Sequence, residues 1–402
     1  MKKYLALALL FGLALAQEGP ALSGSLTYEF GLRYTDLAIA KNEARFSLRL
    51  ETGLEDAALV AEFQASPERV GLGEAYAEVY LGAFDLAAGR ILENTGRTDL
   101  FSPLDAFNPK DLARPIAAPE DQKRPLEALR LAYYPEGARA EIRLLYAPRF
   151  VPSTPPTGPW ARPLPLPPGV VKVETHAPAA TLENGVFGIR AGTSLEVLDG
   201  LDLGATLLYT YTPFPGLKAL LSATDPSQPC PDPNAGPCIA VLGYDRLLLA
   251  GGDFALAFSV PGVEGGFVAR AEAAYGRTQD PAGTDPFVQD GYLEGVLELE
   301  HTFPEGPTVL ALYRARQSPI PGWTHHLALS ARYEADEALT LEGAWVQNLT
   351  DGSGAILPRV RYRLADGLEA LFQASVFYGG PASEFGLWRD NGELGAELRY
   401  AF

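Results

Sequence analysis

The segment 43–51 reads EARFSLRLE and alternates without a break between polar and apolar side chains. Its apolar members are Ala44, Phe46, Leu48 and Leu50, and every residue between them is glutamate, arginine or serine. Successive side chains of a β-strand point to opposite faces of the sheet. The segment therefore predicts a strand with one apolar face and one charged face.

The same period of two continues through the rest of the chain. It appears from Ser25 to Tyr34 and again in 139–147, 186–197, 201–212, 263–275, 292–301, 324–334, 339–348, 358–364, 368–378 and 393–402. Apolar stripes with helical spacing are hard to find. The pattern predicts an all-β protein.

The connections between these segments alternate in length. Short turns are expected near 53–56, 82–83, 135–138, 198–200, 260–263, 304–307, 335–338 and 365–367. Longer or more variable loops are expected at 36–40, 66–72, 93–125, 148–181, 214–243, 277–289, 318–322, 350–353 and 379–391. Short turns at one end and long loops at the other are typical of outer-membrane barrels, whereas a soluble sandwich or propeller lacks that asymmetry. We predict a transmembrane antiparallel up-and-down β-barrel of about 18 strands. Sixteen is the alternative, because 83–93 and 244–260 alternate poorly.

The N-terminus predicts where the chain is sent. Residues 1–16, MKKYLALALLFGLALA, combine two lysines, a short apolar run and a small-residue cleavage site, which predicts a secretory signal peptide. A membrane-anchoring helix is the weaker alternative, because the run is shorter than the ~20 residues that span a bilayer. Residues 17–402 are then a single barrel in the cell outer membrane. Cys230 and Cys238 are expected to form a disulfide in that oxidising compartment.

Composition excludes several classes of protein. The 402 residues include 50 acidic and 32 basic side chains, for a net charge of −18. Such acidity argues against nucleic-acid binding, and two cysteines cannot make a disulfide-rich scaffold or a four-cysteine zinc site.

Aromatic residues near strand ends suggest girdles at the two membrane interfaces. They are Tyr146, Tyr209, Tyr211, Phe303, Tyr313, Trp323, Tyr378 and Trp388.

Two stretches resemble known families. The last segment, ELGAELRYAF ending at Phe402, resembles the C-terminal strand that bacterial outer-membrane β-barrel proteins present to the barrel-assembly machinery. The stretch GRILENTGRTDLFSPLDAFNPKD from Gly89 to Asp111 resembles a loop of porin-like and of exopolysaccharide-export or capsule-binding barrels. The matching positions are Gly89, Arg90, Gly96, Pro103, Asp105, Asn108, Pro109 and Asp111. The resemblance implies a transport or binding barrel.

If the apolar faces meet lipid, the charged faces line the lumen, which must then contain water or close ion pairs. Arginines on neighbouring predicted strands form a candidate basic stripe: Arg314, Arg316, Arg332, Arg359, Arg361 and Arg363. Candidate acidic lining residues are Glu294, Glu298, Glu334 and Glu342. The stripe attracts anionic groups in one interpretation. In the other, its arginines pair laterally with these glutamates and stiffen the wall.

Loop 93–125 is a candidate constriction of the channel. It offers Arg97, Asp99, Asp105, Asp111 and Arg114. The alternative is a surface loop stiffened by its prolines. Loop 148–181 is rich in proline; it either forms a lid or a contact with a surface polymer, or it serves as stiff shielding.

The predicted function is passive diffusion of small hydrophilic solutes across the outer membrane. The alternative is a barrel that binds or exports a surface polysaccharide. We expect no enzymatic activity, no cofactor and no metal. His326 and Ser330 lie four residues apart on one strand face, about 13 Å at strand rise, which is too far for a hydrogen-bonded nucleophile and base.

Overall fold

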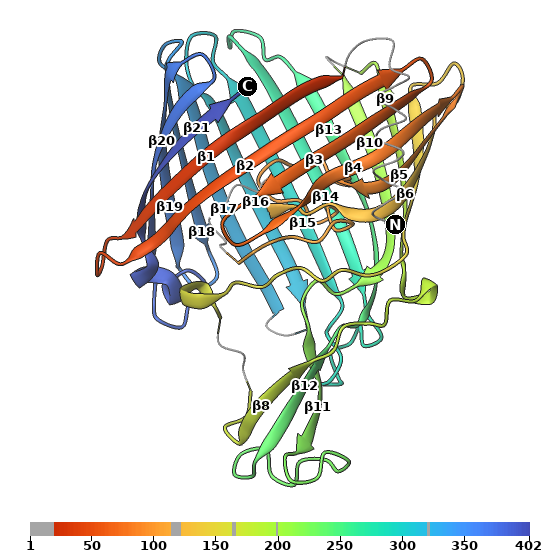
Figure 1. The fold of residues 1–402 in the computed structure, drawn as a ribbon, viewed down its shortest axis with the longest axis vertical. Helices are drawn as coiled ribbons and strands as arrows, with labels where there is room; N and C mark the ends of the chain where they lie inside the picture. Colours follow the sequence, from red (N-terminus) through yellow and green to blue (C-terminus); the bar gives the residue numbers. More distant parts are fainter. Residues whose placement is uncertain (1–19, 114–121, 163–165, 198–199, 320–321) are drawn as a thin grey trace.

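The computed structural model describes residues 20–113, 122–162, 166–197, 200–319 and 322–402. The predicted signal peptide lies outside these residues. Eighteen antiparallel strands form one sheet that closes on itself, with each strand paired to its neighbours in chain order (Figure 1). The predicted strand number is therefore confirmed, and the alternative of 16 is not found.

The strands of the barrel come in the following order. They are β1 (Ala21–Arg33), β2 (Ile39–Leu54), β3 (Ala57–Ala65), β4 (Val70–Leu81), β5 (Phe84–Ile91), β6 (Leu126–Tyr133), β7 (Ala140–Ala147), β9 (Val186–Leu195), β10 (Leu201–Tyr211), β13 (Arg246–Phe258), β14 (Gly266–Arg277), β15 (Tyr292–Thr302), β16 (Thr308–Ser318), β17 (Gly322–Glu334), β18 (Leu339–Asn348), β19 (Gly354–Ala365), β20 (Leu368–Tyr378) and β21 (Glu393–Ala401). The two segments that alternate poorly are β5 and β13.

The first and last strands close the barrel. β1 pairs with β21 in a continuous register from Ser25 opposite Ala401 to Arg33 opposite Glu393. Beyond this ladder, the backbones of Gly24 and Phe402 exchange two hydrogen bonds of 2.9 and 3.0 Å. Closure leaves no free sheet edge, and a bilayer requires this because lipid cannot hydrogen-bond to the backbone.

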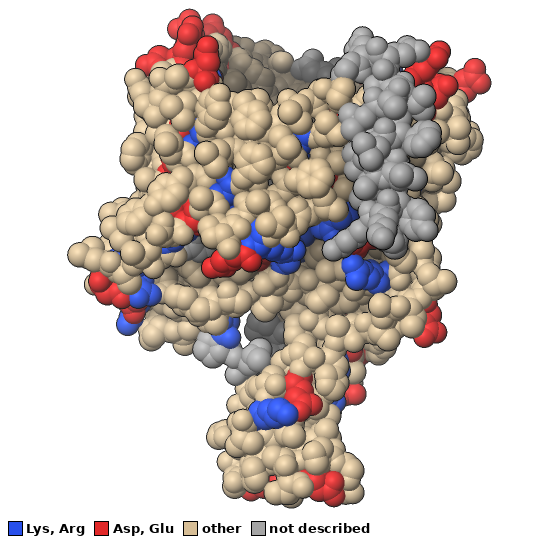
Figure 2. Space-filling model, in the orientation of Figure 1, with Lys and Arg blue, Asp and Glu red and all other residues tan. Residues whose placement is uncertain are grey.

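The outer wall carries the apolar half of the alternation. Most of the visible wall is neither acidic nor basic, and acidic side chains gather at the end opposite the projecting sheet (Figure 2). Exposed aromatic residues lie near the short turns, for example Tyr80, Phe84 and Phe303, and near the long loops, for example Tyr209 and Trp323. Such rings sit where the membrane meets water.

Two aromatic residues expected in these girdles lie elsewhere. Trp388 is only 5% exposed and packs against Trp160, and Tyr211 is 8% exposed against Phe150. Both lie in or beside long connections, which fold over the barrel mouth instead of leaving the strand ends open to the membrane interface.

The long connections contain structure of their own. Those after β7 and β10 contribute β8 (Val170–Thr175), β11 (Gly216–Ser222) and β12 (Cys238–Gly243), which form a three-stranded sheet projecting beyond the long-loop end (Figure 1). Three short 3₁₀ helices also occur: η1 (Gly158–Trp160), η2 (Leu182–Asn184) and η3 (Gly386–Asn391). Within the described residues, no helix is long and apolar enough to cross a membrane.

Closure predicts an electrophoretic signature. Unheated protein in sodium dodecyl sulfate should run as a compact band, and boiling should shift it to the mobility of the unfolded chain. The closed hydrogen-bonded sheet resists the detergent because no edge strand is available to peel away. Equal mobility before and after boiling, from protein that stays soluble without detergent, would contradict a membrane barrel.

Candidate functional site: the barrel interior

The connection between β5 and β6 lies inside the barrel. Leu104 is 0% exposed and Phe107 is 4% exposed. Both pack into a cluster of buried residues from the inner wall, which includes Leu126, Leu208 and Leu249. Further along the wall, Leu100 and Phe101 pack against Val296, Leu310, Leu312 and Ala328. This apolar contact holds the described part of the loop, residues 92–113 and 122–125, against one side of the lumen.

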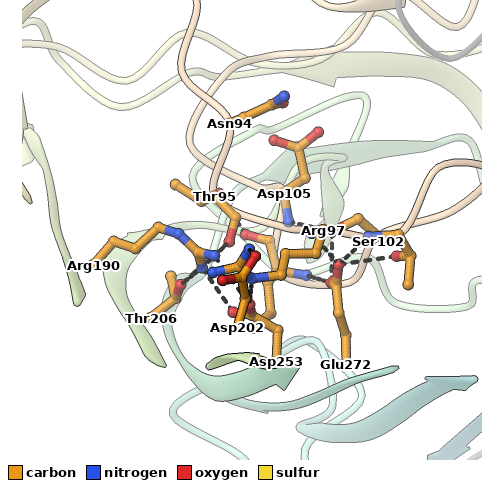
Figure 3. Close-up of polar contacts among 12 residues, drawn as sticks. Asn94, Thr95, Arg97, Ser102, Asp105, Arg190, Asp202, Thr206, Asp253 and Glu272 are labelled. Atoms are coloured by element: carbon orange, nitrogen blue, oxygen red, sulfur yellow. Dashed lines mark hydrogen bonds and ion pairs between the residues drawn. The ribbon is translucent and has the colours of Figure 1, made fainter. Parts of the chain in front are cut away.

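One carboxylate from the wall holds the start of the inward loop. Glu272 on β14 is 3% exposed and accepts five hydrogen bonds from the loop (Figure 3). Its Oε1 accepts from the backbone N–H groups of Arg97 and Thr98 at 2.5 and 2.7 Å, and from the Thr98 hydroxyl at 2.9 Å. Its Oε2 accepts from Ser102 Oγ at 2.6 Å and Leu104 N–H at 3.3 Å. A buried carboxylate is stable only with such complete hydrogen bonding.

A second carboxylate is shared between the loop and the wall. Asp253 on β13 accepts from the Arg97 guanidinium and from Arg190 on β9 at 2.8 and 3.1 Å. Arg190 also donates to the carbonyl of Thr95 at 2.7 Å and to Thr206 Oγ1 at 2.8 Å (Figure 3). Two arginines around one buried aspartate fix the position of the loop with charge-assisted hydrogen bonds.

A third contact involves Asp99, at the lumen side of the loop. Its backbone N–H donates to Glu298 Oε2 on β15 at 3.1 Å, and its own carboxylate lies 3.3 Å from Arg270. Burial raises the pKa of the Asp99 carboxyl, with Glu300 acting in the same direction and Arg270 opposing it. Arg270 also pairs with Glu298 at 2.9 Å.

Two residues of the stretch from Gly89 to Asp111 that resembles porin-like barrels help to fold the loop. Asn108 Nδ2 donates to the carbonyls of Ile91 and Arg124 at 2.9 and 3.1 Å, and its Oδ1 accepts from Glu93 N–H at 2.7 Å. These three bonds tie the two ends of the loop together. Gly96 is required because an added Cβ would lie 1.8 Å from Ser102 Oγ.

The other acidic residues singled out in the loop pair with basic residues of the same loop. Asp105 pairs with Lys123 at 2.7 Å and lies 3.9 Å from Lys110. Asp111 pairs with Arg124 at 3.2 Å. Arg114 lies outside the described residues. The alternation places Arg190 and Glu272 on the inward face of their strands but does not mark them as anchors, because their partners are distant in the chain. Asp253 is not marked from sequence at all.

The predicted basic stripe divides into paired and unpaired arginines. Arg314 and Arg316 on β16 both contact Glu294, at 2.6 and 3.7 Å. Their guanidinium groups also lie 4.0 and 4.1 Å from the ring centres of Phe101 and Tyr292. These contacts hold both guanidinium groups against neighbouring side chains of the wall and the loop.

The arginines nearer the short-turn end are less constrained. Arg332 pairs with Glu334 at 2.9 Å, but both side chains are more than half exposed. Arg361 lies 3.4 Å from Glu369 and 3.9 Å from Glu342. Arg359 and Arg363 on β19 have no ion-pair partner among the residues that the structure describes. Arg359 lines a small hollow with Gln373, Ser375 and Glu393.

The two cysteines are joined in the projecting sheet, as predicted. Cys230 and Cys238 form a disulfide, with a Cα–Cα distance of 5.6 Å. Cys238 is 0% exposed and opens β12, the central strand, which pairs antiparallel with β11 and parallel with β8. The bond therefore closes the tip of this sheet.

Replacing both cysteines with serine should loosen the projecting sheet alone. The disulfide closes a short loop, which stabilises the folded chain by roughly 2–3 kcal/mol in the chain-entropy model. We expect faster protease cleavage within 214–243 and unchanged channel conductance. A change in conductance would show that the sheet contributes to the channel.

The fold and interior define a class of protein. A closed barrel of 18 antiparallel strands, with an apolar outside, a charged inside and short turns at one end, has the architecture of a porin-like outer-membrane barrel. In the described part of the chain, no group of three or more His, Cys, Asp or Glu is placed to hold a metal ion.

No protein-family model and no curated protein sequence matches this chain. Solved structures match it along nearly its whole length. The Pseudomonas aeruginosa protein OccK2 (OpdF), in complex with glucuronate, matches with a TM-score of 0.60 and 10% identity over 96% of this chain and 99% of that one. Pseudomonas aeruginosa OpdK with vanillate gives 0.58 and 9%, over 96% and 99%. Acinetobacter baumannii OccAB1 gives 0.56 and 9%, over 95% and 96%. At about 10% identity, the likeness shows that this chain shares the fold of these proteins.

Proposed function

We propose that this protein is a porin-like channel in the outer membrane, through which small hydrophilic solutes diffuse passively. The observation that carries the proposal is the inward loop, held by Glu272 and Asp253 against one side of a charged lumen. A wide barrel with a polar interior encloses a water-filled path, and a fixed loop narrows it. Loop 93–125 is the constriction in this proposal.

The solutes are proposed to include small anions. Neither Arg359 nor Arg363 has a carboxylate oxygen within 4.0 Å among the described residues, although Glu342 and Glu369 lie opposite them on the neighbouring strands. Guanidinium groups on a pore wall bind carboxylates or phosphates through fixed pairs of N–H donors. Two structural neighbours were crystallised with carboxylates, glucuronate and vanillate, which supports this solute class. No enzymatic step is part of the proposal.

We propose a route to the membrane that uses two segments of the sequence. The signal peptide predicted at 1–16 directs export, and the C-terminal strand ending at Phe402 engages the barrel-assembly machinery. Tyr400 and Phe402 lie on the outer face of the barrel, 47% and 51% exposed, where an assembly partner can reach them.

Solute influx into liposomes tests the proposal. Proteoliposomes placed in an isotonic solution of a monosaccharide or a small carboxylate salt should swell faster than empty liposomes. The carboxylate should enter faster than the monosaccharide, because the guanidinium groups of Arg359 and Arg363 attract anions. Liposomes that do not swell with either solute, while the protein binds a surface polysaccharide, would replace the channel with the binding alternative.

A further inference from the structure

A proline-rich segment crosses the mouth of the barrel. Residues 148–162, here called the crossbar, leave the wall at the end of β7 and reach the inner faces of β19 and β20. In the order around the closed sheet, β7 is the seventh strand, and β19 and β20 are the sixteenth and seventeenth. The crossbar therefore spans the full width of the opening at the long-loop end (Figure 1).

The middle of the crossbar is fixed to the inward loop. Thr154 N–H donates to the carbonyl of Lys110 at 2.9 Å, and Leu112 N–H donates to the carbonyl of Thr154 at 3.0 Å. Thr157 N–H donates to the carbonyl of Ala113 at 3.3 Å. Prolines at 152, 155, 156 and 159 restrict the backbone between these contacts. The crossbar is stiff and continuous with the constriction.

The far end is held by a pair of tryptophans. Trp160 is 3% exposed and packs in an apolar cluster with Phe377 and Trp388, at ring-centre distances of 5.5 and 5.8 Å. Trp388 Nε1 donates to the carbonyl of Trp160 at 3.0 Å, and Asn391 Nδ2 donates to the carbonyl of Pro159 at 2.6 Å. We call Trp160, Trp388 and Asn391 the latch.

An ion pair beside the latch adds to it. The Arg162 guanidinium lies 4.6 Å from the ring centre of Trp388 and 3.6 Å from Glu384. Glu384 also accepts hydrogen bonds from His326 Nε2 at 2.6 Å and Asn348 Nδ2 at 2.8 Å. Burial alone would raise the pKa of Glu384, but these partners lower it to about 2. Glu384 is therefore an anion under all ordinary conditions.

We propose that the latched crossbar, together with the inward loop to which it is bonded, sets the upper size limit of the channel, and that Trp160 and Trp388 are specificity-determining residues. This inference rests on the proposed function. A bar fixed at both walls divides the mouth, so a solute must fit through one of the two parts. The width of each part of the mouth depends on where the latch holds the crossbar. Pore width is one of the determinants of channel selectivity.

Liposome swelling with neutral sugars of increasing size tests the size limit without a charge effect. Trp160→Ala and Trp388→Ala should each release the bar, because each empties the aromatic cluster that holds its end. Monosaccharide entry should change little, and entry of tri- and tetrasaccharides should rise several-fold. Trp323→Ala is the matched control, since Trp323 is 53% exposed on the outer wall and touches no part of the crossbar.

Asn391→Ala provides a milder second variant. It removes one hydrogen bond to the bar and leaves the tryptophans in place, so it should raise large-sugar entry to a smaller extent. The heat-dependent gel shift selects folded protein for every variant. An unchanged size limit in the folded latch variants would overturn the inference. Wild-type liposomes that admit no sugar would instead overturn the proposed function.

Discussion

Glu272→Ala is expected to raise the single-channel conductance several-fold. The substitution removes the acceptor of five hydrogen bonds, three of them from backbone N–H groups of the inward loop. Each buried N–H left without a partner costs about 1–3 kcal/mol, so segment 94–104 should leave the wall or become mobile. Conductance in planar bilayers, together with its noise, measures the change.

Glu272→Gln should have an intermediate effect. The amide keeps one oxygen acceptor and replaces the other with a donor, so only part of the set of bonds at Glu272 can form. Glu334→Ala is the control: it also removes one acidic side chain, but Glu334 is exposed and contacts Arg332 instead of the loop. Conductance that stays at the wild-type value in Glu272→Ala would mean that the loop does not limit flow.

The double substitution Arg359→Gln with Arg363→Gln is expected to move the channel's preference from anions towards cations. The net charge of −18 favours cations, whereas two unpaired guanidinium groups on the lumen wall favour anions at close range. Without them, the remaining charge of the interior should decide selectivity. The reversal potential measured in a salt gradient should shift towards the equilibrium potential of the cation.

A charge-matched control separates wall charge from total charge. Arg69→Gln with Arg139→Gln removes two charges from exposed positions in connections at the barrel ends. The reversal potential of this control should stay close to that of the wild type. If both double variants shift the reversal potential equally, the total charge of the protein determines selectivity, and Arg359 and Arg363 have no special role.

The barrel could be predicted from the sequence because its signals are local. Each strand shows its own alternation, and the difference between turns such as 82–83 and loops such as 93–125 gives the strand order without any long-range contact. β5 and β13 alternate poorly, because residues there pack against the inward loop as well as the wall. Leu247 and Leu249, for example, are 2% and 0% exposed on the inner side of β13.

The site could be predicted only in part. The sequence marks loop 93–125 and the arginine stripe, but the position of the loop depends on Glu272, which lies 175 residues beyond Arg97. The parallel pairing of β8 with β12 joins two separate proline-rich loops that carry no strand pattern. Trp388 follows a strand end as a girdle residue would, and only the crossbar's path across the mouth places it in the latch.

Single-channel recording of the purified wild-type protein in a planar bilayer tests the central claim most directly. A passive channel should give stable stepwise insertions, each with a current proportional to voltage. Folded protein that gives the heat-dependent gel shift and inserts into the membrane, yet produces no conductance steps, would contradict a passive channel.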